Sequence, residues 1–405
     1  MAREQAGHDP VSEEHSAKST ASTWSFILKV FAASRLFYLL AGVLFVGALP
    51  VSSFQRQTLD VPFGALSMWA HYDGERYVSI ALYGYDESSG EASPAFFPLY
   101  PLIVRSVAEL FGGPLSPGAV SVWGVLVSLT ALPFALWFLY RITEQGWGEQ
   151  AARGTVLILA FFPTTFFLNS VYTESLFLAL STGSVWAVRV RKDLLLACLL
   201  AGLAAATRNV GVLLTIPLIY EWWRNRHEYG WKAVYLALAP SGLLAYAGYL
   251  WWRFGAPLLF LEKQAEWGRG LSGPFDALRD AFGLAASSLI SVFESGALFQ
   301  ALGGLYYFWN LLFLLLAYVM LSVGVRWLSV DLALYGFALV LVPVFFGATA
   351  DPLLSMPRFV LVAFPIFIAL GIALKDRRLI AGWLVASVIL SLAFTALFVN
   401  WYFVA

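Results

Sequence analysis

Residues 118–140 read GAVSVWGVLVSLTALPFALWFLY, a run without one charged side chain. An α-helix needs about 20 apolar residues to cross the hydrocarbon core of a bilayer, so this run is long enough for one span. The rest of the chain has the same character, because 60% of its 405 residues are hydrophobic and only 12% are charged. Soluble domains carry about a quarter of charged residues. The sequence therefore predicts an all-α, polytopic membrane protein.

Glycine, proline and charged residues divide the chain into about eleven apolar segments, which we expect to be transmembrane helices. They lie at 24–49, 118–140, 154–170, 174–188, 193–207, 210–222, 232–252, 305–325, 331–347, 359–374 and 379–403. The fifth and sixth are short for a span and are expected to be tilted, broken or buried by neighbours. Residues 1–22 are polar, lack the pattern of a signal peptide and are predicted to be a disordered tail. Residues 23–405 are predicted to form a single transmembrane domain.

Basic residues orient these segments. They gather in alternate gaps, at 141–153, 189–192, 224–232, 326 and 375–378. All of these gaps lie on one side if the N-terminus is cytoplasmic, and the positive-inside rule makes that side the cytoplasm. Residues 50–117 and 253–304 then form two long extracytoplasmic loops. Residues 96–113 are predicted to be an interfacial helix, since a span there would place the later basic clusters outside.

Other features limit the function. The net charge of zero gives no argument for a nucleic-acid partner. No set of His, Asp and Glu residues has a metal-binding spacing, so no metal or other cofactor is expected. The single cysteine, Cys198, cannot form an intrachain disulfide and is expected in the core. Arg35 lies deep in the first segment and needs a partner, either an acid in a structural ion pair or a lipid phosphate.

The most informative charged stretch is Trp69-Ala-His-Tyr-Asp-Gly-Glu-Arg-Tyr77, just after the first segment. Asp73 in this loop can be ionised yet partly desolvated, which suits a general base. The alternative role for Asp73 is that of a turn or helix-capping residue. Glu75 is alternatively half of a solvated pair with Arg76, and His71 is a surface or capping residue.

Further candidates lie at other outer loop mouths. Asn169, Tyr172 and Glu174 can bind a sugar, while Thr173 or Asn169 caps a helix. Arg208 and Arg358, with Lys263, form a candidate anion site, because a guanidinium clamps phosphate or carboxylate; the alternative is an ion pair with an acid such as Asp351. The aromatic residues before two prolines shape an apolar groove for a lipid tail, or are belt residues at helix starts. They are Phe96, Phe97 and Phe162.

An ordered set of short motifs resembles the PIG-V-type mannosyltransferases, which belong to the GT-C superfamily of integral membrane glycosyltransferases. The motifs span most of the chain from residue 24 onward. They are Tyr72-Asp73-Gly74 with Gly84-Tyr85, Phe96-Phe-Pro-Leu-Tyr-Pro101, Phe162-Pro163, Asn169-Ser-Val-Tyr-Thr-Glu-Ser175, Thr207-Arg-Asn-Val-Gly211, Gln264 with Trp267, and Ser355-Met-Pro-Arg358 with Phe364-Pro365.

The resemblance implies a GT-C-like architecture with an active site on the extracytoplasmic face. It maps the catalytic base onto Asp73, although the family more usually has Trp-Asp where this chain has Tyr72-Asp73. It also adds Tyr72, Glu75, Asn209, Gln264 and Trp267 to the residues expected to bind sugar or acceptor. The donor would be a polyprenyl-phosphate sugar.

The sequence thus predicts an inverting glycosyltransferase that moves a hexose, by resemblance mannose, to a hydroxyl of a glycolipid, glycan or protein. The expected setting is a prokaryotic cell membrane, with membrane lipids and an accessory membrane subunit as further partners. Two alternatives stay open. One is a flippase or exporter of lipid-linked sugars, and the other is a non-catalytic subunit of a membrane glycosylation complex.

Overall fold

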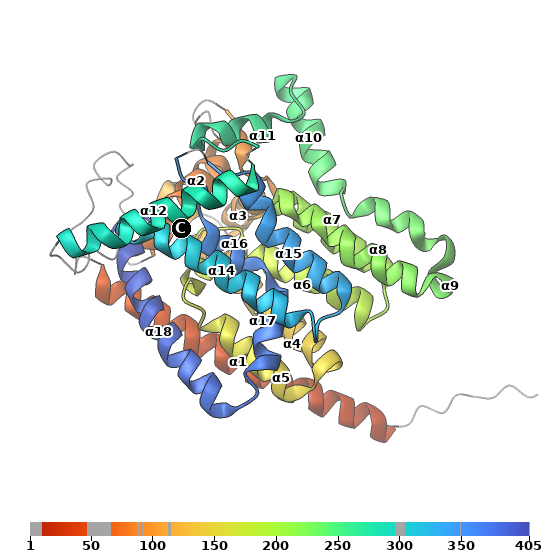
Figure 1. The fold of residues 1–405 in the computed structure, drawn as a ribbon. Helices are drawn as coiled ribbons and strands as arrows, with labels where there is room; N and C mark the ends of the chain where they lie inside the picture. The colour runs from red at the N-terminus through yellow and green to blue at the C-terminus, as the bar shows by residue number, and fades with distance from the viewer. Residues whose placement is uncertain are drawn as a thin grey trace, which may run out of the picture.

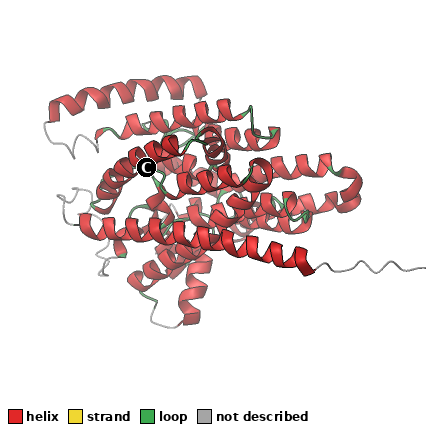
Figure 2. Cartoon of the chain, turned by 90° about the horizontal axis from the view of Figure 1, so that it is seen from below, coloured by secondary structure: helices red, strands yellow, loops and turns green. Residues whose placement is uncertain are grey.

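The computed structural model describes residues 10–46, 66–86, 90, 93–111, 115–271, 273–295, 304–348 and 350–404. Within these ranges the chain is helical, and its only β pairing is an isolated bridge between Arg269 and Ala348. Figures 1 and 2 show the helices from two directions. The α-helices are α1 (Pro10–Phe45), α2 (Asp73–Tyr83), α3 (Leu99–Phe111), α4 (Pro117–Trp147), α5 (Glu149–Ala160), α6 (Glu174–Arg189), α7 (Leu194–Thr207), α8 (Thr215–Arg224), α9 (Arg226–Tyr229), α10 (Ser241–Phe254), α11 (Leu259–Glu262), α12 (Pro274–Ser295), α14 (Tyr306–Gly324), α15 (Val330–Phe345), α16 (Met356–Val362), α17 (Phe364–Ala373) and α18 (Arg377–Val399). Short 3₁₀ helices are η2 (Ser67–Ala70), η4 (Ser93–Ala95), η5 (Thr165–Leu168), η6 (Asn209–Leu214), η7 (Gly230–Leu238) and η8 (Lys263–Trp267).

Five helices in the described ranges are long and apolar enough to cross a membrane. They are Thr20–Phe45, Pro117–Trp147, Arg226–Phe254, Tyr306–Gly324 and Arg377–Val399. The pair α16 and α17, bent by 71°, makes a sixth if it counts as one span. The predicted all-α, polytopic membrane fold is therefore confirmed. Every predicted segment has a helical counterpart, but the number of eleven spans is not confirmed. The first helix begins at Pro10, inside the predicted tail, and residues 1–9 of that tail lie outside the described residues.

The third predicted segment, 154–170, is wrong in its second half. Helix α5 ends at Ala160, and the chain then forms the 3₁₀ turn η5. Pro163 explains the break, because a proline has no N–H to donate and clashes with the preceding helical turn. The sixth segment is likewise broken, into η6 and α8.

Arg35 occupies the break after α5. Its side chain is buried, at 2% exposure. It donates hydrogen bonds to the backbone oxygens of Ala160 (2.7 Å) and Thr165 (3.0 Å) and to Oδ1 of Asn169 (2.9 Å). The expectation of an acid or a lipid phosphate as its partner is wrong. Arg35 instead donates hydrogen bonds to carbonyl oxygens near the end of α5. Carbonyl groups at a helix end have no partner within the helix, so a buried helix end needs such a donor.

Close helix packing forms the core. Helix α4 packs along α6, α6 along α7, and α17 along α5. The last pair meets at Gly371, where an added Cβ would lie 2.1 Å from Oγ1 of Thr155. Small residues allow such approach between membrane helices. Cys198 is buried in α7, as expected.

The loops fall into two sets at opposite ends, as the basic-residue pattern predicts. At one end, Arg189 bonds Glu221 (3.0 Å) and Asp331, and Trp147 donates to the backbone oxygen of Trp327 (3.1 Å). These residues lie in gaps assigned to the cytoplasm or at the segment ends beside them. The loops assigned to the outside meet at the other end, around the site described below. Which end faces the cytoplasm stays a prediction.

The predicted interfacial segment 96–113 contains helix α3. It packs on α2 and α4, and the apolar side chains of Leu102, Leu110 and Phe111 are exposed. An exposed apolar face is what a helix lying against lipid requires.

Candidate active site

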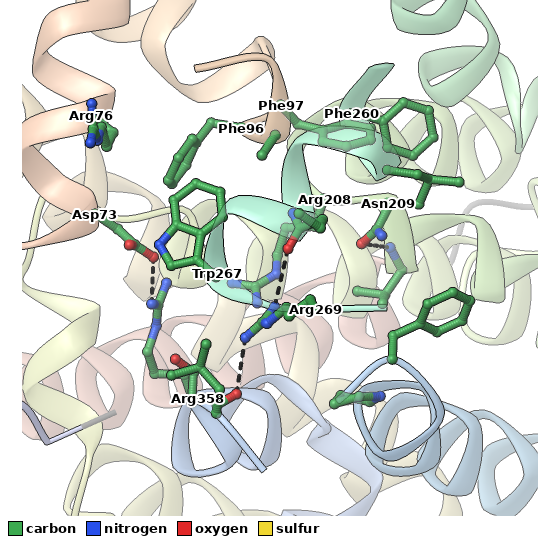
Figure 3. Close-up of a pocket in the computed structure, with 18 of the residues that line it drawn as sticks. Asp73, Arg76, Phe96, Phe97, Arg208, Asn209, Phe260, Trp267, Arg269 and Arg358 are labelled. Atoms are coloured by element: carbon green, nitrogen blue, oxygen red, sulfur yellow. Dashed lines mark hydrogen bonds and ion pairs between the residues drawn. The ribbon is translucent and has the colours of Figure 1, made fainter. Parts of the chain in front are cut away.

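One cavity of about 1020 Å³ opens where the outer loops meet. Its walls come from the start of α2, η4, the junction of α7 and η6, the segment from α11 to Leu271, α15 and α16. Figure 3 shows residues from these segments turned toward one another. Most predicted site residues line the cavity, namely Tyr72, Asp73, Glu75, Phe96, Phe97, Arg208, Asn209, Gln264, Trp267 and Arg358.

A network of two acids and two arginines forms one wall. Nη1 of Arg358 donates to Oδ2 of Asp73 at 2.6 Å, and its Nε donates to Oε1 of Glu174 at 2.9 Å. Nη1 of Arg208 donates to the same Glu174 oxygen at 2.9 Å. The Glu174 side chain is fully buried, whereas that of Asp73 is 31% exposed. Asp73 is therefore the carboxylate of this network that the cavity reaches.

The backbone before Asp73 is held in an unusual conformation. Tyr72 has φ of 56°, and Asp73 is the first residue of α2. The preceding residues are tied to the 171–172 turn, since Val171 N–H donates to Trp69 O (2.9 Å) and the Tyr172 hydroxyl donates to His71 O (2.9 Å). Non-glycine residues in such regions cost about 1–3 kcal/mol and cluster at functional sites. The capping alternative for Asp73 is not observed, because its carboxylate bonds Arg358 instead.

Three residues predicted to bind sugar do not line the cavity. Asn169 bonds Arg35, and Glu174 is buried between two arginines. The ring centroid of Tyr172 lies 4.5 Å from the guanidinium carbon of Arg358, in a cation–π contact. Thr173 precedes α6 without a side-chain cap and accepts a hydrogen bond from Arg208 (3.2 Å). These residues fix the arginines and do not line the cavity.

Two other predicted residues also lie away from the cavity. Lys263 forms an ion pair with Glu266 at 2.9 Å. Phe162 is buried in the core, edge-on to Phe313 and Phe367. Phe96 and Phe97 do line the cavity, so one of the two aromatic–proline motifs contributes to it.

Arg269 is a site residue that the sequence analysis missed. It lies between Gly268 and Gly270 on the loop after η8 and lines the cavity. Its Nη2 donates to Leu354 O (3.0 Å) and its Nη1 to Oε1 of Gln264 (3.4 Å). A lone arginine in a glycine-rich loop gives no periodic signal. The flanking glycines were the available hint, because they allow close approach of backbones.

Burial changes the protonation of two groups beside Asp73. Burial raises the pKa of Glu75 to about 7, and the charge of Arg76 opposes this. Burial lowers the pKa of His71 to about 4, although a bond to Phe398 O opposes it. His71 is therefore neutral near pH 7, while Glu75 titrates there. In the described residues, no three His, Cys, Asp or Glu side chains are grouped to hold a metal ion.

Comparison with known proteins gives the family resemblance. Residues 25–219 match the family model described as mannosyltransferase (PIG-V), which confirms the resemblance over that part of the chain. Those residues include Asp73, Glu174 and Arg208.

Two curated relatives are named GPI mannosyltransferase 2. That of Drosophila pseudoobscura pseudoobscura is 35% identical over 121 residues, covering 28% of this chain and 25% of the relative. That of Drosophila melanogaster is 33% identical over 174 residues, covering 37% of each. The matched region thus spans between a quarter and two fifths of these relatives. Among solved structures, an oligosaccharyltransferase of Archaeoglobus fulgidus aligns with 90% of this chain and 53% of its own, at 12% identity and a TM-score of 0.40.

Proposed function

We propose that this chain, whose residues 25–219 match the PIG-V mannosyltransferase family, is an inverting mannosyltransferase. It would move mannose from a polyprenyl-phosphate donor to an acceptor hydroxyl in the cavity described above. The observation that carries the proposal is the half-buried Asp73 carboxylate, which faces that cavity and is held by Arg358.

The chemistry needs one proton acceptor and one leaving group. The oxygen of the acceptor hydroxyl bonds the anomeric carbon, and Asp73 takes the proton of that hydroxyl. The bond from that carbon to the donor phosphate breaks, and polyprenyl phosphate leaves with the electron pair. Attack from the face opposite the phosphate inverts the anomeric carbon. Arg358 contacts Oδ2 of Asp73, so Oδ1 is the oxygen that we assign to the proton. A free aspartate has a pKa of about 3.9 and is a weak base, which suits a late proton transfer.

The arginines of the wall have a positioning role in this scheme. Arg358 bonds two carboxylates and Arg208 bonds one. Each buried acid needs such a partner, because an unpaired buried charge is costly. A phosphate would have to compete with these acids for the same guanidinium groups. We therefore assign Arg358 and Arg208 first to holding Asp73 and Glu174.

The remaining cavity residues suit a sugar and an acceptor. Asn209, Gln264 and Glu75 offer polar groups for hydroxyls, and Trp267 offers a ring face. Phe96 and Phe97 are assigned to the first part of a lipid tail. The proposal includes the GT-C-like architecture, a site on the extracytoplasmic face, a cytoplasmic N-terminus, a prokaryotic cell membrane and an accessory membrane subunit.

The test is transfer of labelled mannose from a polyprenyl-phosphate donor by the purified chain in lipid nanodiscs. The acceptors are glycolipid and glycan extracts, and the anomeric configuration of the product is read by NMR. Mannose transferred with inversion supports the proposal. A chain that carries the donor across vesicle membranes without transfer is a flippase, and the proposal then fails.

A further inference from the structure

Arg269 differs from the other two cavity arginines in its partners. Arg358 is paired with Asp73 and Glu174, and Arg208 with Glu174. The hydrogen bonds recorded for the Arg269 side chain go to two neutral oxygens, Leu354 O and Oε1 of Gln264. No ion pair of Arg269 is found in the part of the chain that the structure describes. Its positive charge is therefore not matched by a contacting acid.

The local charge balance gives the same result. In the contact network of the wall, two arginines face two carboxylates, and Arg269 stands beside this network without joining it. Asp73 and, more weakly, Asp351 attract Arg269 through space without a contact, and Arg358 repels it. Glu75, Arg76 and Glu262 also line the cavity, but no ion pair joins Glu75 or Glu262 to Arg269 in the described residues. A partly buried, unmatched guanidinium is costly and is stabilised when an anion arrives.

The Arg269 side chain is held in place although it lies on a loop. Its residue bridges Ala348, and the next N–H, that of Gly270, donates to Gly347 O at 3.2 Å. Its guanidinium carbon lies 5.6 Å from the ring centroid of Phe359, a ring that Arg208 also contacts at 5.5 Å. A preorganised guanidinium loses little entropy on binding a ligand and presents its planar fork directly.

The surroundings of Arg269 suit a ligand with a charged head and an apolar tail. Val342, Pro343 and Phe346 line the same cavity from the end of α15, close to the strand-like contact of Arg269 with Ala348. Phe346 is 43% exposed on the outer surface. Figure 3 shows Arg269 to the right of the Asp73–Arg358 pair, with Trp267 between Asp73 and Arg269 in this view.

We propose that Arg269 binds the phosphate of the lipid-linked donor, and that of the polyprenyl phosphate released from it. The inference rests on the proposed function and changes one part of it. The phosphate then lies at the second external loop, while Arg358 keeps Asp73 aligned for the acceptor. Arg358, Arg208 and Lys263, the residues first expected to hold the phosphate, are each paired with a carboxylate instead.

The test is binding of undecaprenyl phosphate to the full chain in nanodiscs, followed by native mass spectrometry. Arg269→Gln should weaken binding about 30-fold, because a hydrogen-bonded charge pair is lost. Arg269→Lys should give an intermediate loss, because it keeps the charge and loses the fork. The matched control is Arg279→Gln, in which an exposed arginine of the same loop region, paired with Asp276 and Asp280, is removed. It should bind like the wild type.

Two further ligands distinguish a lipid-linked phosphate from free inorganic phosphate as the ligand of Arg269. Undecaprenol, which lacks the charge, should bind weakly and equally to wild type and Arg269→Gln. Inorganic phosphate should compete with undecaprenyl phosphate only at high concentration if the tail contributes. Equal binding of undecaprenyl phosphate and undecaprenol by the wild type would overturn the inference.

The outcome can be separated from that of the proposed function. Mannose transfer by the wild type with undiminished undecaprenyl phosphate binding in Arg269→Gln would refute the phosphate assignment alone. If undecaprenyl phosphate binding depends on Arg269 but the wild type transfers no mannose, the proposed enzyme function is refuted and the phosphate site at Arg269 is supported. If Arg269→Gln does not fold by size exclusion, Arg269→Lys decides the result.

Discussion

The ring of Trp267 meets that of Phe96 edge-on, with centroids 5.7 Å apart and planes at 77°. This contact joins the loop predicted at 253–304 to the loop predicted at 50–117, and Figure 3 shows both rings. Phe96 also meets Tyr77 of α2 edge-on at 5.2 Å, so a row of rings links the helix that carries Asp73 to the loop that carries Arg269. Contacts between the two loops are therefore expected to control donor binding.

Replacing Trp267 and Phe96 tests this coupling. Each alanine variant should raise KM for the donor, and the double variant should lose less than the sum of the two. An edge-to-face aromatic pair contributes about 0.5–1.5 kcal/mol beyond its buried area. A double-mutant cycle on kcat/KM measures the coupling. Strict additivity would show that the loops act independently.

Replacing Asp73 tests the base. Asp73→Asn keeps the shape and removes the proton acceptor, so turnover should fall by about 10²–10⁴-fold. Undecaprenyl phosphate binding should stay within a few-fold of the wild type. Asp276→Asn, an exposed acid of α12, is the matched control. Wild-type turnover in Asp73→Asn would remove this residue from the base role.

Replacing Arg358 separates positioning from phosphate binding. Arg358→Ala leaves Asp73 without its partner and Glu174 with Arg208 alone. Breaking a buried pair costs about 3–5 kcal/mol, so the thermal midpoint should drop clearly. Turnover should fall much more than donor affinity. A loss of undecaprenyl phosphate affinity as large as that in Arg269→Gln would return the phosphate to Arg358.

Glu75 predicts a pH dependence of stability. Its pKa is raised to about 7 by burial, well above that of an exposed glutamate. The folded state therefore holds this proton more tightly, and the stabilisation is present below pH about 4 and lost as pH rises through 7. The thermal midpoint of the wild type relative to Glu75→Gln should fall between pH 5 and pH 8. A difference that is constant over this range would contradict the shift.

The arginine at the opposite end should affect stability alone. Arg189 joins α6 to Glu221 of α8 and Asp331 of α15. Arg189→Ala should lower stability by about 3 kcal/mol or more, because it leaves two buried acids without their counter-charge. Its donor affinity should not change. Arg191→Ala, at an exposed neighbouring position, should melt like the wild type.

The sequence predicted the parts of the fold that depend on composition. Apolar runs mark helices. The basic residues in alternate gaps between these runs predicted that Asp73, Arg208 and Arg358 lie at the same end, and in the structure all three belong to one cavity wall. It failed at Phe162-Pro163, where a break inside an apolar run was read as a continuous helix.

The sequence did not predict the direction in which the polar side chains of the loops point. Glu174 and Asn169 lie in the turn that was predicted, yet their side chains face Arg358 and Arg35 inside the protein. Which polar residues of a loop turn inward depends on contacts with segments 134 and 184 positions away in the chain. Arg269 was missed for the same reason, because its place in the cavity follows from the fold of its loop.

The shared oxygen of Glu174 constrains the order in which the protein assembles during synthesis. Oε1 accepts hydrogen bonds from Arg208, made soon after it, and from Arg358, made much later. Until α16 emerges from the ribosome, Glu174 has one of its two counter-charges and Asp73 has none of its own. A chain that stops before α16 would therefore lack the arginine that joins the two acids.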